Sequence, residues 1–179
     1  MAVRKITTHP AQVLRRKAHK VTHFDSSLQQ IIADMIDTMR DEPGVGLAAP
    51  QVNVPLKVVV VEYSEVGETI DHSQKLYIVV NPEITRFSEE VEQGIEGCLS
   101  IPGFAGEVER PEKITLKGQD RKGKNIKIKA EGWLARIFQH EIDHLNGILF
   151  IDRAQNVWKV EEEQFFINIL LGMFHLQKI

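Results

Sequence analysis

Hydrophobic side chains recur every three or four positions along two stretches of the chain, and this spacing predicts two long helices. The first is expected over residues 26–40, with Ser26 and Gln29 as a capping pair at its start. The second is expected over residues 133–145, because an Asn-Gly pair closes the pattern at residues 146–147. Each helix has a broad apolar face and is expected to pack against the core.

Two further helices are expected near the ends of the chain. Residues 10–17 are predicted to form a short helix. Residues 157–175 predict a markedly apolar helix whose first turns contain Glu161, Glu162 and Glu163, as the helix dipole favours. This C-terminal helix is expected to pack on its own domain, so a monomer is favoured, and a homodimer formed through it is the alternative.

Runs rich in valine and isoleucine predict β-strands through the middle of the chain. The expected strands cover residues 57–62, 76–84, 105–110, 113–119 and 125–130, with a short extended segment at residues 148–152. Residues 63–75 predict an exposed polar loop, and residues 119–124 predict a hairpin turn. These elements predict one α+β domain over residues 1–179. Mixed or antiparallel sheets are expected to pack around a central buried metal-binding helix, with N-terminal helices and a C-terminal helix.

The composition narrows the class of protein. The 179 residues carry a net charge of −3 and no basic run, so no specific nucleic-acid partner is expected. The single cysteine excludes an internal disulfide and fits a reducing compartment. No signal-peptide pattern or bilayer-spanning apolar stretch is present, so no membrane partner is expected. We expect a cytoplasmic protein, with an organellar protein that has lost its transit peptide as the alternative.

The chemistry of the chain is concentrated in the second long helix. His140 and His144 are four residues apart, so they lie about 40° apart on one helix face, where both can bind one metal ion. Glu141 projects about 100° around the helix from His140, which suits a general base acting on a metal-activated water. A catalytic zinc-type site keeps three protein ligands and one open position, and Cys98 is the best candidate for the third ligand.

An ordinary buried helix with two core histidines is the alternative explanation of this pattern. The apolar side chains cover a wide arc that includes both histidines, whereas Arg136, Gln139 and Asp143 are expected on the polar side of the helix. Two imidazoles and a carboxylate within an apolar arc are costly unless they have partners. A metal ion is the partner that satisfies all three groups, and this favours the metal site.

Three separated segments resemble the three sequence signatures of the peptide deformylases, in the same order. They are residues 44–51 (GVGLAAPQ), 96–100 (EGCLS) and 139–147 (QHEIDHLNG). The resemblance implies a hydrolase that removes the N-formyl group from the initiator methionine of nascent chains and releases formate. It also implies one divalent ion held by Cys98, His140 and His144. This ion is usually Fe2+ in the family, and Zn2+, Ni2+ or Co2+ can replace it.

The resemblance also implies roles in catalysis for three further residues. Glu141 would act as general base and then as general acid, while a metal-bound hydroxide attacks the formyl carbon. The Gln51 side-chain amide and the Leu99 backbone N–H would donate hydrogen bonds to the oxyanion that forms.

Substrate contacts are expected on both sides of this site. A peptide strand is expected to add edge-on to Val45 and Gly46 and to the segment from Ile101 to Gly103 through main-chain hydrogen bonds. The other expected contacts are Gly97, Arg110 against the peptide backbone, and Trp133, Ile137 and His140 around the methionine side chain.

The sequence departs from the family pattern in ways that affect the expected contacts. Trp133 and Arg136 stand where relatives often carry aliphatic residues, which leaves the size and charge of the methionine pocket open. Some relatives end in a basic helix that associates with the ribosome. The tail of this chain is apolar and begins with acidic residues, so the sequence gives no support for ribosome association.

Two other functions are compatible with the motif. A metallopeptidase would take its third ligand downstream of the histidines, where the candidates are Asp152, residues 161–163 and His175. A non-catalytic formyl-peptide-binding module would have a vestigial site or one closed by a fourth protein ligand. The presence of Glu141 argues against this module, because a spectator metal needs no base.

Overall fold

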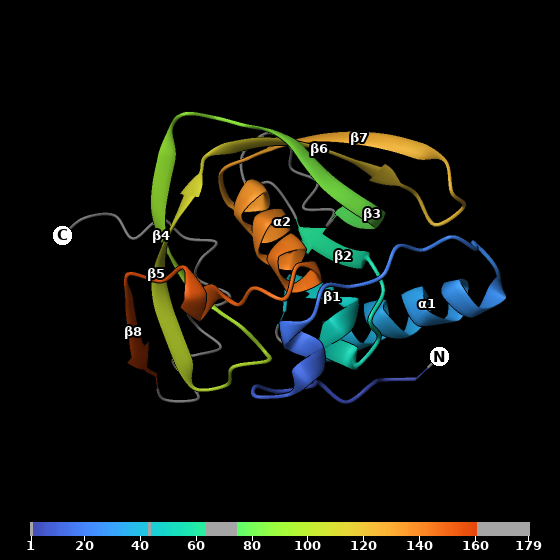
Figure 1. Cartoon of the computed structure of the whole chain (residues 1–179), viewed down its shortest axis with the longest axis horizontal. Coiled ribbons are helices and arrows are strands. Elements are labelled where there is room, and N and C mark those ends of the chain that lie inside the picture. The colour runs from blue at the N-terminus through green and yellow to red at the C-terminus, as the bar shows by residue number, and fades with distance from the viewer. Residues whose placement is uncertain (1, 43, 64–74, 161–179) are drawn as a thin grey trace, which may run out of the picture.

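Two helices, two β-sheets and three short 3-10 helices make up the part of the chain that the structure describes. The computed structural model describes residues 2–42, 44–63 and 75–160 (Figure 1). The helices are α1 (Ser26–Asp41) and α2 (Gly132–Leu145), and the 3-10 helices are η1 (Gln12–Arg15), η2 (Ala49–Val52) and η3 (Phe150–Asp152). None of the helices in these ranges combines the length and the apolar character that crossing a membrane requires.

Both sheets pair their strands antiparallel throughout. The larger sheet has the order β1-β2-β3-β6-β7, and the smaller has the order β4-β5-β8. The strands of the larger sheet are β1 (Gly46–Ala48), β2 (Val58–Tyr63), β3 (Lys75–Phe87), β6 (Lys113–Gln119) and β7 (Asn125–Glu131). Those of the smaller sheet are β4 (Val91–Gly97), β5 (Phe104–Pro111) and β8 (Asn156–Lys159). The predicted α+β class, with antiparallel sheets, is confirmed.

Helix α2 lies between the two sheets, at the centre of the molecule (Figure 1). Phe138 on this helix is fully buried, and its ring meets that of Tyr77 edge-on with centroids 5.5 Å apart. Leu134, Ile137 and other apolar residues of α2 join the same core cluster as the inward side chains of β2, β3 and β6. The predicted central buried helix is therefore confirmed, and its packing gives the site a rigid support.

Helix α2 ends where the Asn-Gly pair predicts. Gly147 follows the last turn with φ of +75°, a left-handed conformation that glycine adopts without strain. A Cβ atom on Gly147 would lie 2.7 Å from the carbonyl carbon of Arg15, so the N-terminal segment also packs too closely for any side chain there. The helix terminus is thus fixed by both conformation and packing.

Helix α1 begins as expected but with a different cap. The Asp25 carboxylate accepts a hydrogen bond from the Leu28 backbone N–H at 3.1 Å, so Asp25 is the N-cap and the predicted pairing of Ser26 with Gln29 is wrong. An aspartate caps a helix as well as a serine does, and the sequence offers both in adjacent positions.

The five predicted strands are present, whereas β1, β4 and β8 were not predicted. β1 has only three residues, and β4 is polar along most of its length. Asn156–Lys159 is extended and pairs with β5, so the predicted start of the C-terminal helix at residue 157 is wrong. The rest of that predicted helix, and residues 64–74 of the predicted polar loop, lie outside the described residues.

Two short segments differ from their predictions because they form single 3-10 turns. The predicted helix over residues 10–17 is reduced to η1. The segment 148–152, predicted to be extended, contains η3, and the Asp152 side chain accepts from the Leu149 backbone N–H at 2.8 Å to close it.

Candidate metal centre and active site

The metal-binding side chains predicted from the sequence converge in the structure. Helix α2 carries His140 and His144 on one face, and Cys98 follows directly after the end of β4. The Cys98 Sγ atom lies 3.2 Å from His144 Nε2, and the donor atoms of the three residues all lie within 4.8 Å of one another. The two imidazole rings are 5.0 Å apart between centroids. Among the described residues, these are the three grouped donors.

The free and occupied nitrogen atoms of the imidazoles fit metal binding. His140 Nδ1 lies 3.0 Å from Glu96 Oε2, which leaves His140 Nε2 for an ion. His144 turns Nε2 towards Cys98, and its buried Nδ1 has no hydrogen-bond partner within the described chain. Around a tetrahedral ion with bonds of about 2.0–2.3 Å, donor atoms are about 3.3–3.8 Å apart. The three donors therefore need only small movements to surround one ion.

The candidate ligands of the metallopeptidase alternative lie elsewhere or outside the described residues. The Asp152 carboxylate contacts Arg15 and the Leu149 backbone N–H, and it is absent from the donor cluster. Residues 161–163 and His175 lie outside the described residues.

The electrostatics of the metal-free site depend on burial and on the neighbours of each ring. Burial opposes a charge on His140, but its hydrogen bonds to Cys98 and Glu96 outweigh burial and hold its pKa well above the ordinary value. For His144, burial and then the charge of His140 hold the pKa well below the ordinary value. His144 is thus ready to bind as a neutral imidazole, whereas His140 must lose a proton when an ion arrives.

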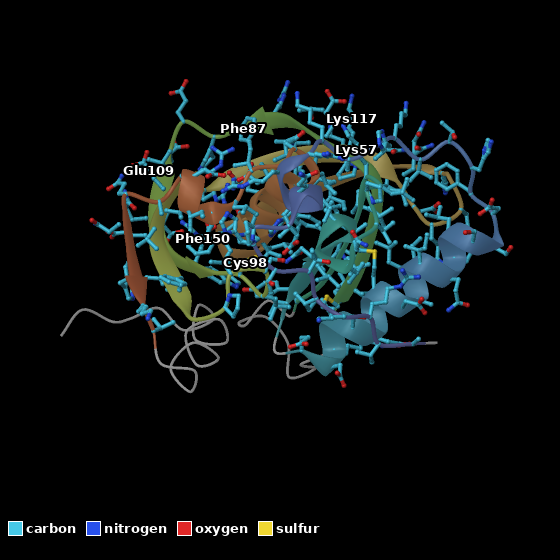
Figure 2. All side chains as sticks on the ribbon, turned by 60° about the horizontal axis from the view of Figure 1, so that its bottom comes forward. Lys57, Phe87, Cys98, Glu109, Lys117 and Phe150 are labelled. Atoms are coloured by element: carbon cyan, nitrogen blue, oxygen red, sulfur yellow. The ribbon has the colours of Figure 1, made fainter. Side chains whose placement is uncertain are left out.

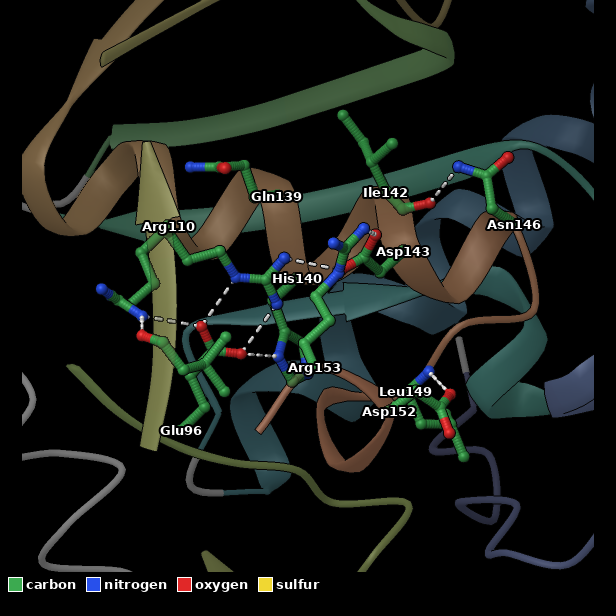
Figure 3. Close-up of polar contacts among 12 residues, drawn as sticks. Glu96, Arg110, Gln139, His140, Ile142, Asp143, Asn146, Leu149, Asp152 and Arg153 are labelled. Atoms are coloured by element: carbon green, nitrogen blue, oxygen red, sulfur yellow. Dashed lines mark hydrogen bonds and ion pairs between the residues drawn. The ribbon is translucent and has the colours of Figure 1, made fainter. Parts of the chain in front are cut away.

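Glu96 is a buried carboxylate with charged partners on both of its oxygens (Figure 3). Arg110 donates to Oε1 at 2.8 Å and to Oε2 at 2.9 Å, and Arg136 donates to Oε1 at 2.9 Å. Burial by itself would raise the pKa of Glu96, but the hydrogen bonds of Arg110 and His140 outweigh burial and hold it far below its usual range. Glu96 therefore stays ionised behind His140.

The predicted polar side of α2 is buried as well. Arg136, Gln139 and Asp143 are all buried. The Asp143 carboxylate accepts from Arg110 Nη1 at 2.6 Å and from Arg153 at 2.6 and 2.7 Å (Figure 3). An alternating row of carboxylates and guanidiniums therefore runs from Arg153 at the surface to His140.

Glu141 is a buried carboxyl group next to the metal-binding cluster. Burial raises the pKa of Glu141 to about 7, and its Oε2 atom has no partner among the described residues. Gly46 on β1 lies against it: a Cβ atom there would be 2.6 Å from Glu141 Oε1. A carboxyl group with a near-neutral pKa at a metal-binding cluster is suited to accept and return a proton.

Gln51 directs its amide group at the cysteine. The Ala48 backbone N–H donates to Gln51 Oε1 at 2.8 Å, which fixes the amide so that Nε2 faces Cys98 Sγ at 3.5 Å and Ser100 Oγ at 3.4 Å. The structure therefore places a hydrogen-bond donor beside the cluster.

A pocket opens beside this cluster and contains most of the predicted substrate contacts. Its lining includes Val45, Gly46, Gly97, Trp133 and Ile137. It also includes Gln51, Leu99 and Glu141, together with Cys98 and His140. Glu96 and Arg136 line it as well; the sequence assigns no function to Glu96 and identifies Arg136 only through the charge of the methionine pocket.

Three predicted contacts are not brought to the pocket. Ile101 is buried in a small core cluster, and the Gly103 carbonyl oxygen accepts from the Val160 backbone N–H at 3.1 Å. Arg110 lines a different, wider groove, whose lining also includes Lys57, Glu109 and Lys117, three of the residues labelled in Figure 2. Arg110 is buried between Glu96 and Asp143 and does not line this pocket, so the structure gives no support to its expected contact with the peptide backbone.

Comparisons with known proteins agree with this geometry. A family model described as polypeptide deformylase matches residues 3–160. The peptide deformylase of Natranaerobius thermophilus is 47% identical over 162 residues, which cover 90% of this chain and 99% of the relative.

Solved structures match at the level of the fold. The peptide deformylase from Thermotoga maritima superposes with a TM-score of 0.78 at 41% identity, covering 87% of this chain and 100% of that chain. A Met-Ala-Ser-bound class I type b peptide deformylase from Acinetobacter baumannii gives 0.77 at 36% identity, covering 85% and 98%. This chain belongs to the peptide deformylases, hydrolases that remove the N-formyl group from nascent peptides.

Proposed function

We propose that Cys98, His140 and His144 hold one divalent metal ion and that Glu141 moves the proton during hydrolysis of the formyl amide. The convergence of one thiol and two imidazoles beside a buried carboxyl group is the observation that carries this proposal. When bound, the ion would polarise the formyl carbonyl and lower the pKa of a water molecule. Three protein ligands leave a position open for that chemistry, as catalytic sites require.

Glu141 is proposed to act first as general base and then as general acid. Its carboxylate would take a proton from the attacking water and return it to the methionine nitrogen as the C–N bond breaks, so that formate and a free amine leave. The raised pKa of Glu141 in the metal-free protein supports this exchange, because a group that titrates near neutrality can both accept and release a proton.

The developing oxyanion is proposed to be stabilised by Gln51 and Leu99. The Gln51 amide nitrogen already points towards Cys98, and Ala48 fixes its orientation. The Leu99 residue lines the same pocket, and its backbone N–H would be the second donor. Donors that are held in place before the reaction stabilise the transition state without reorganisation.

The substrate is proposed to bind as an extended strand between β1 and β4. Each of these strands is at the end of its sheet within the described chain, so each has an unpaired edge. Main-chain pairing accepts many sequences, and the pocket beside Trp133 and Ile137 would take the methionine side chain. The Met-Ala-Ser bound to the Acinetobacter relative is consistent with such a short peptide.

The identity of the ion, the domain organisation, the oligomeric state and the location are also part of the proposal. We favour Fe2+ as the native ion because of the family resemblance, although the donor set accepts several first-row metals. We also propose one domain, a monomer and a cytoplasmic location.

Formate release is the experiment that tests the proposal. The protein loaded with Fe2+ under anaerobic conditions is expected to release formate from formyl-Met-Ala-Ser and to leave internal peptide bonds intact. Cys98→Ser is expected to lose the metal and the activity. Cleavage of internal bonds, or metal retention by Cys98→Ser, would support the metallopeptidase alternative. Binding of the formyl peptide without formate release would support the binding module.

A further inference from the structure

Arg136 is a buried arginine behind the candidate metal centre. It lies on α2 one turn before His140, and only 4% of its surface is exposed. Its Nη1 donates to Glu96 Oε1 and to the Val108 carbonyl oxygen, both at 2.9 Å, and its Nη2 donates to the Glu92 carbonyl oxygen at 2.6 Å. The side chain therefore joins α2 to both β4 and β5.

Gly94 on β4 leaves the space that this guanidinium occupies. A Cβ atom on Gly94 would lie 2.7 Å from Arg136 Cζ, 2.8 Å from Nε and 2.9 Å from Nη2. Gly94 is not among the glycines with positive φ, so its backbone conformation does not require glycine. The close approach of Arg136 does require it, and the two residues form one fitted unit.

Glu96 is anchored to two different parts of the fold. Arg110 belongs to β5, the partner strand of β4, so its bonds tie the Glu96 carboxylate to its own hairpin. Arg136 and His140 are four residues apart on one face of α2, and both contact this carboxylate. The contact of Arg136 therefore fixes Glu96 relative to the helix that carries His140.

We infer that Arg136 is a positioning residue for the metal centre: it locks the Glu96 carboxylate to α2, so that His140 keeps Nε2 directed at the ion. This inference rests on the proposed function, in which His140 is a ligand. Partners behind a ligating histidine fix its ring, and their loss typically weakens metal binding about 10–100-fold. Because Arg110 still neutralises Glu96, removal of Arg136 loosens His140 without leaving an unpaired buried charge.

The test measures the Zn2+ affinity of the full chain by competition with a chromophoric chelator, together with the visible spectrum of the Co2+-loaded protein. Arg136→Met replaces the guanidinium by an apolar chain and is expected to weaken Zn2+ binding about 10–100-fold and to alter the Co2+ spectrum. Arg136→Lys keeps the charge but cannot reach Glu96, Val108 and Glu92 together, so it should recover little. Arg40→Met, which removes a surface arginine paired with Glu62, is the matched control and should bind Zn2+ like the parent.

Gly94→Ala tests the same unit without changing the arginine. It is expected to displace the guanidinium and weaken Zn2+ binding. The double variant with Gly94→Ala and Arg136→Met should bind Zn2+ with the same affinity as Arg136→Met alone. Thermal unfolding of the metal-free variants checks that each is folded. If Arg136 had a purely structural role, the Co2+ spectrum of a folded variant would match that of the parent.

The outcomes separate this inference from the proposed function. Zn2+ affinity of Arg136→Met within about twofold of the parent, where 10–100-fold is expected, would overturn the inference, and so would additive losses in the double variant. If Arg136→Met does not fold, parental affinity in both Gly94→Ala and Arg136→Lys would overturn it. A parent protein that binds no Zn2+ would overturn the proposed function instead.

Discussion

Replacing Glu141 by glutamine is expected to remove turnover and, in the metal-free protein, to increase stability at alkaline pH. The carboxyl group is buried, and one of its oxygens has no partner among the described residues. Burial raises its pKa from the ordinary 4.5 to about 7. The same burial that suits Glu141 to proton transfer therefore destabilises the folded, metal-free protein once the carboxyl group must ionise.

The magnitude follows from the displaced pKa. Below pH 4.5 the folded and unfolded chains both keep the proton on Glu141, so there is no penalty. Between pH 4.5 and about 7 only the folded chain keeps it, and the free energy of unfolding falls as the pH rises. Each pH unit corresponds to about 1.4 kcal/mol, so the penalty reaches about 3 kcal/mol above pH 7 and then stays constant.

Urea unfolding of the metal-free protein at pH 4.5 and pH 8 measures this effect. Glutamine does not titrate, so Glu141→Gln escapes the penalty. From pH 4.5 to pH 8 the unfolding free energy of the variant should rise relative to that of the parent by up to about 3 kcal/mol. Glu62→Gln is the control. Its hydrogen bonds with Arg40 lower the pKa of Glu62, so the stability that Glu62 contributes is lost only below pH 4.5, and the difference between this variant and the parent should change little between pH 4.5 and pH 8.

Two results would refute the reasoning on Glu141. An unchanged difference between Glu141→Gln and the parent at the two pH values would mean that burial does not displace the pKa. Formate release by the metal-loaded variant at more than about 1% of the parent rate would argue against the general-base role, because such a group contributes about 10²–10⁴-fold.

Three further changes have clear expected outcomes. Gly46→Ala would place a Cβ atom 2.6 Å from Glu141 Oε1, so kcat/KM for formyl-Met-Ala-Ser should fall about 100-fold at unchanged metal content; parental kcat/KM would contradict this. Gly147→Ala forces alanine to φ of +75° against the Arg15 backbone and should lower the unfolding free energy by at least about 1–2 kcal/mol in urea titrations. Zn2+ at about 1,000 times its Kd should raise the unfolding free energy by about 4 kcal/mol, and Cys98→Ser should remove most of this gain; an equal gain in Cys98→Ser would exclude the thiol as a ligand.

The sequence predicts the features that depend on local spacing. The helical period identifies α1 and α2, and runs of β-branched residues identify the five strands that lie in or beside the core. The spacing of His140 and His144 alone places both on one helix face. Cys98 requires a contact over 46 residues, and the chemistry of a three-ligand site is sufficient to nominate it.

Features that depend on tertiary contacts are not predicted from the sequence. β4 is polar along most of its length, and β8 is a short, exposed strand that pairs with β5. Arg136 and Asp143 are typical of a solvent-facing helix side until β4 and β5 cover them with buried partners. Glu96 is the next-to-last residue of β4 and lies two residues before Cys98, so recognising this strand would place Glu96 close to the cluster.

The two sides of the proposed peptide site come from separate layers of the fold. Cys98 extends the β4–β5 hairpin, whereas the histidines stand on α2 against β1. An ion that bonds to all three would link these layers and set the width of the opening between β1 and β4, whose outer edges are unpaired within the described residues. The metal-bound protein would thus present a groove of constant width to each nascent chain, whatever side chains follow the first residue.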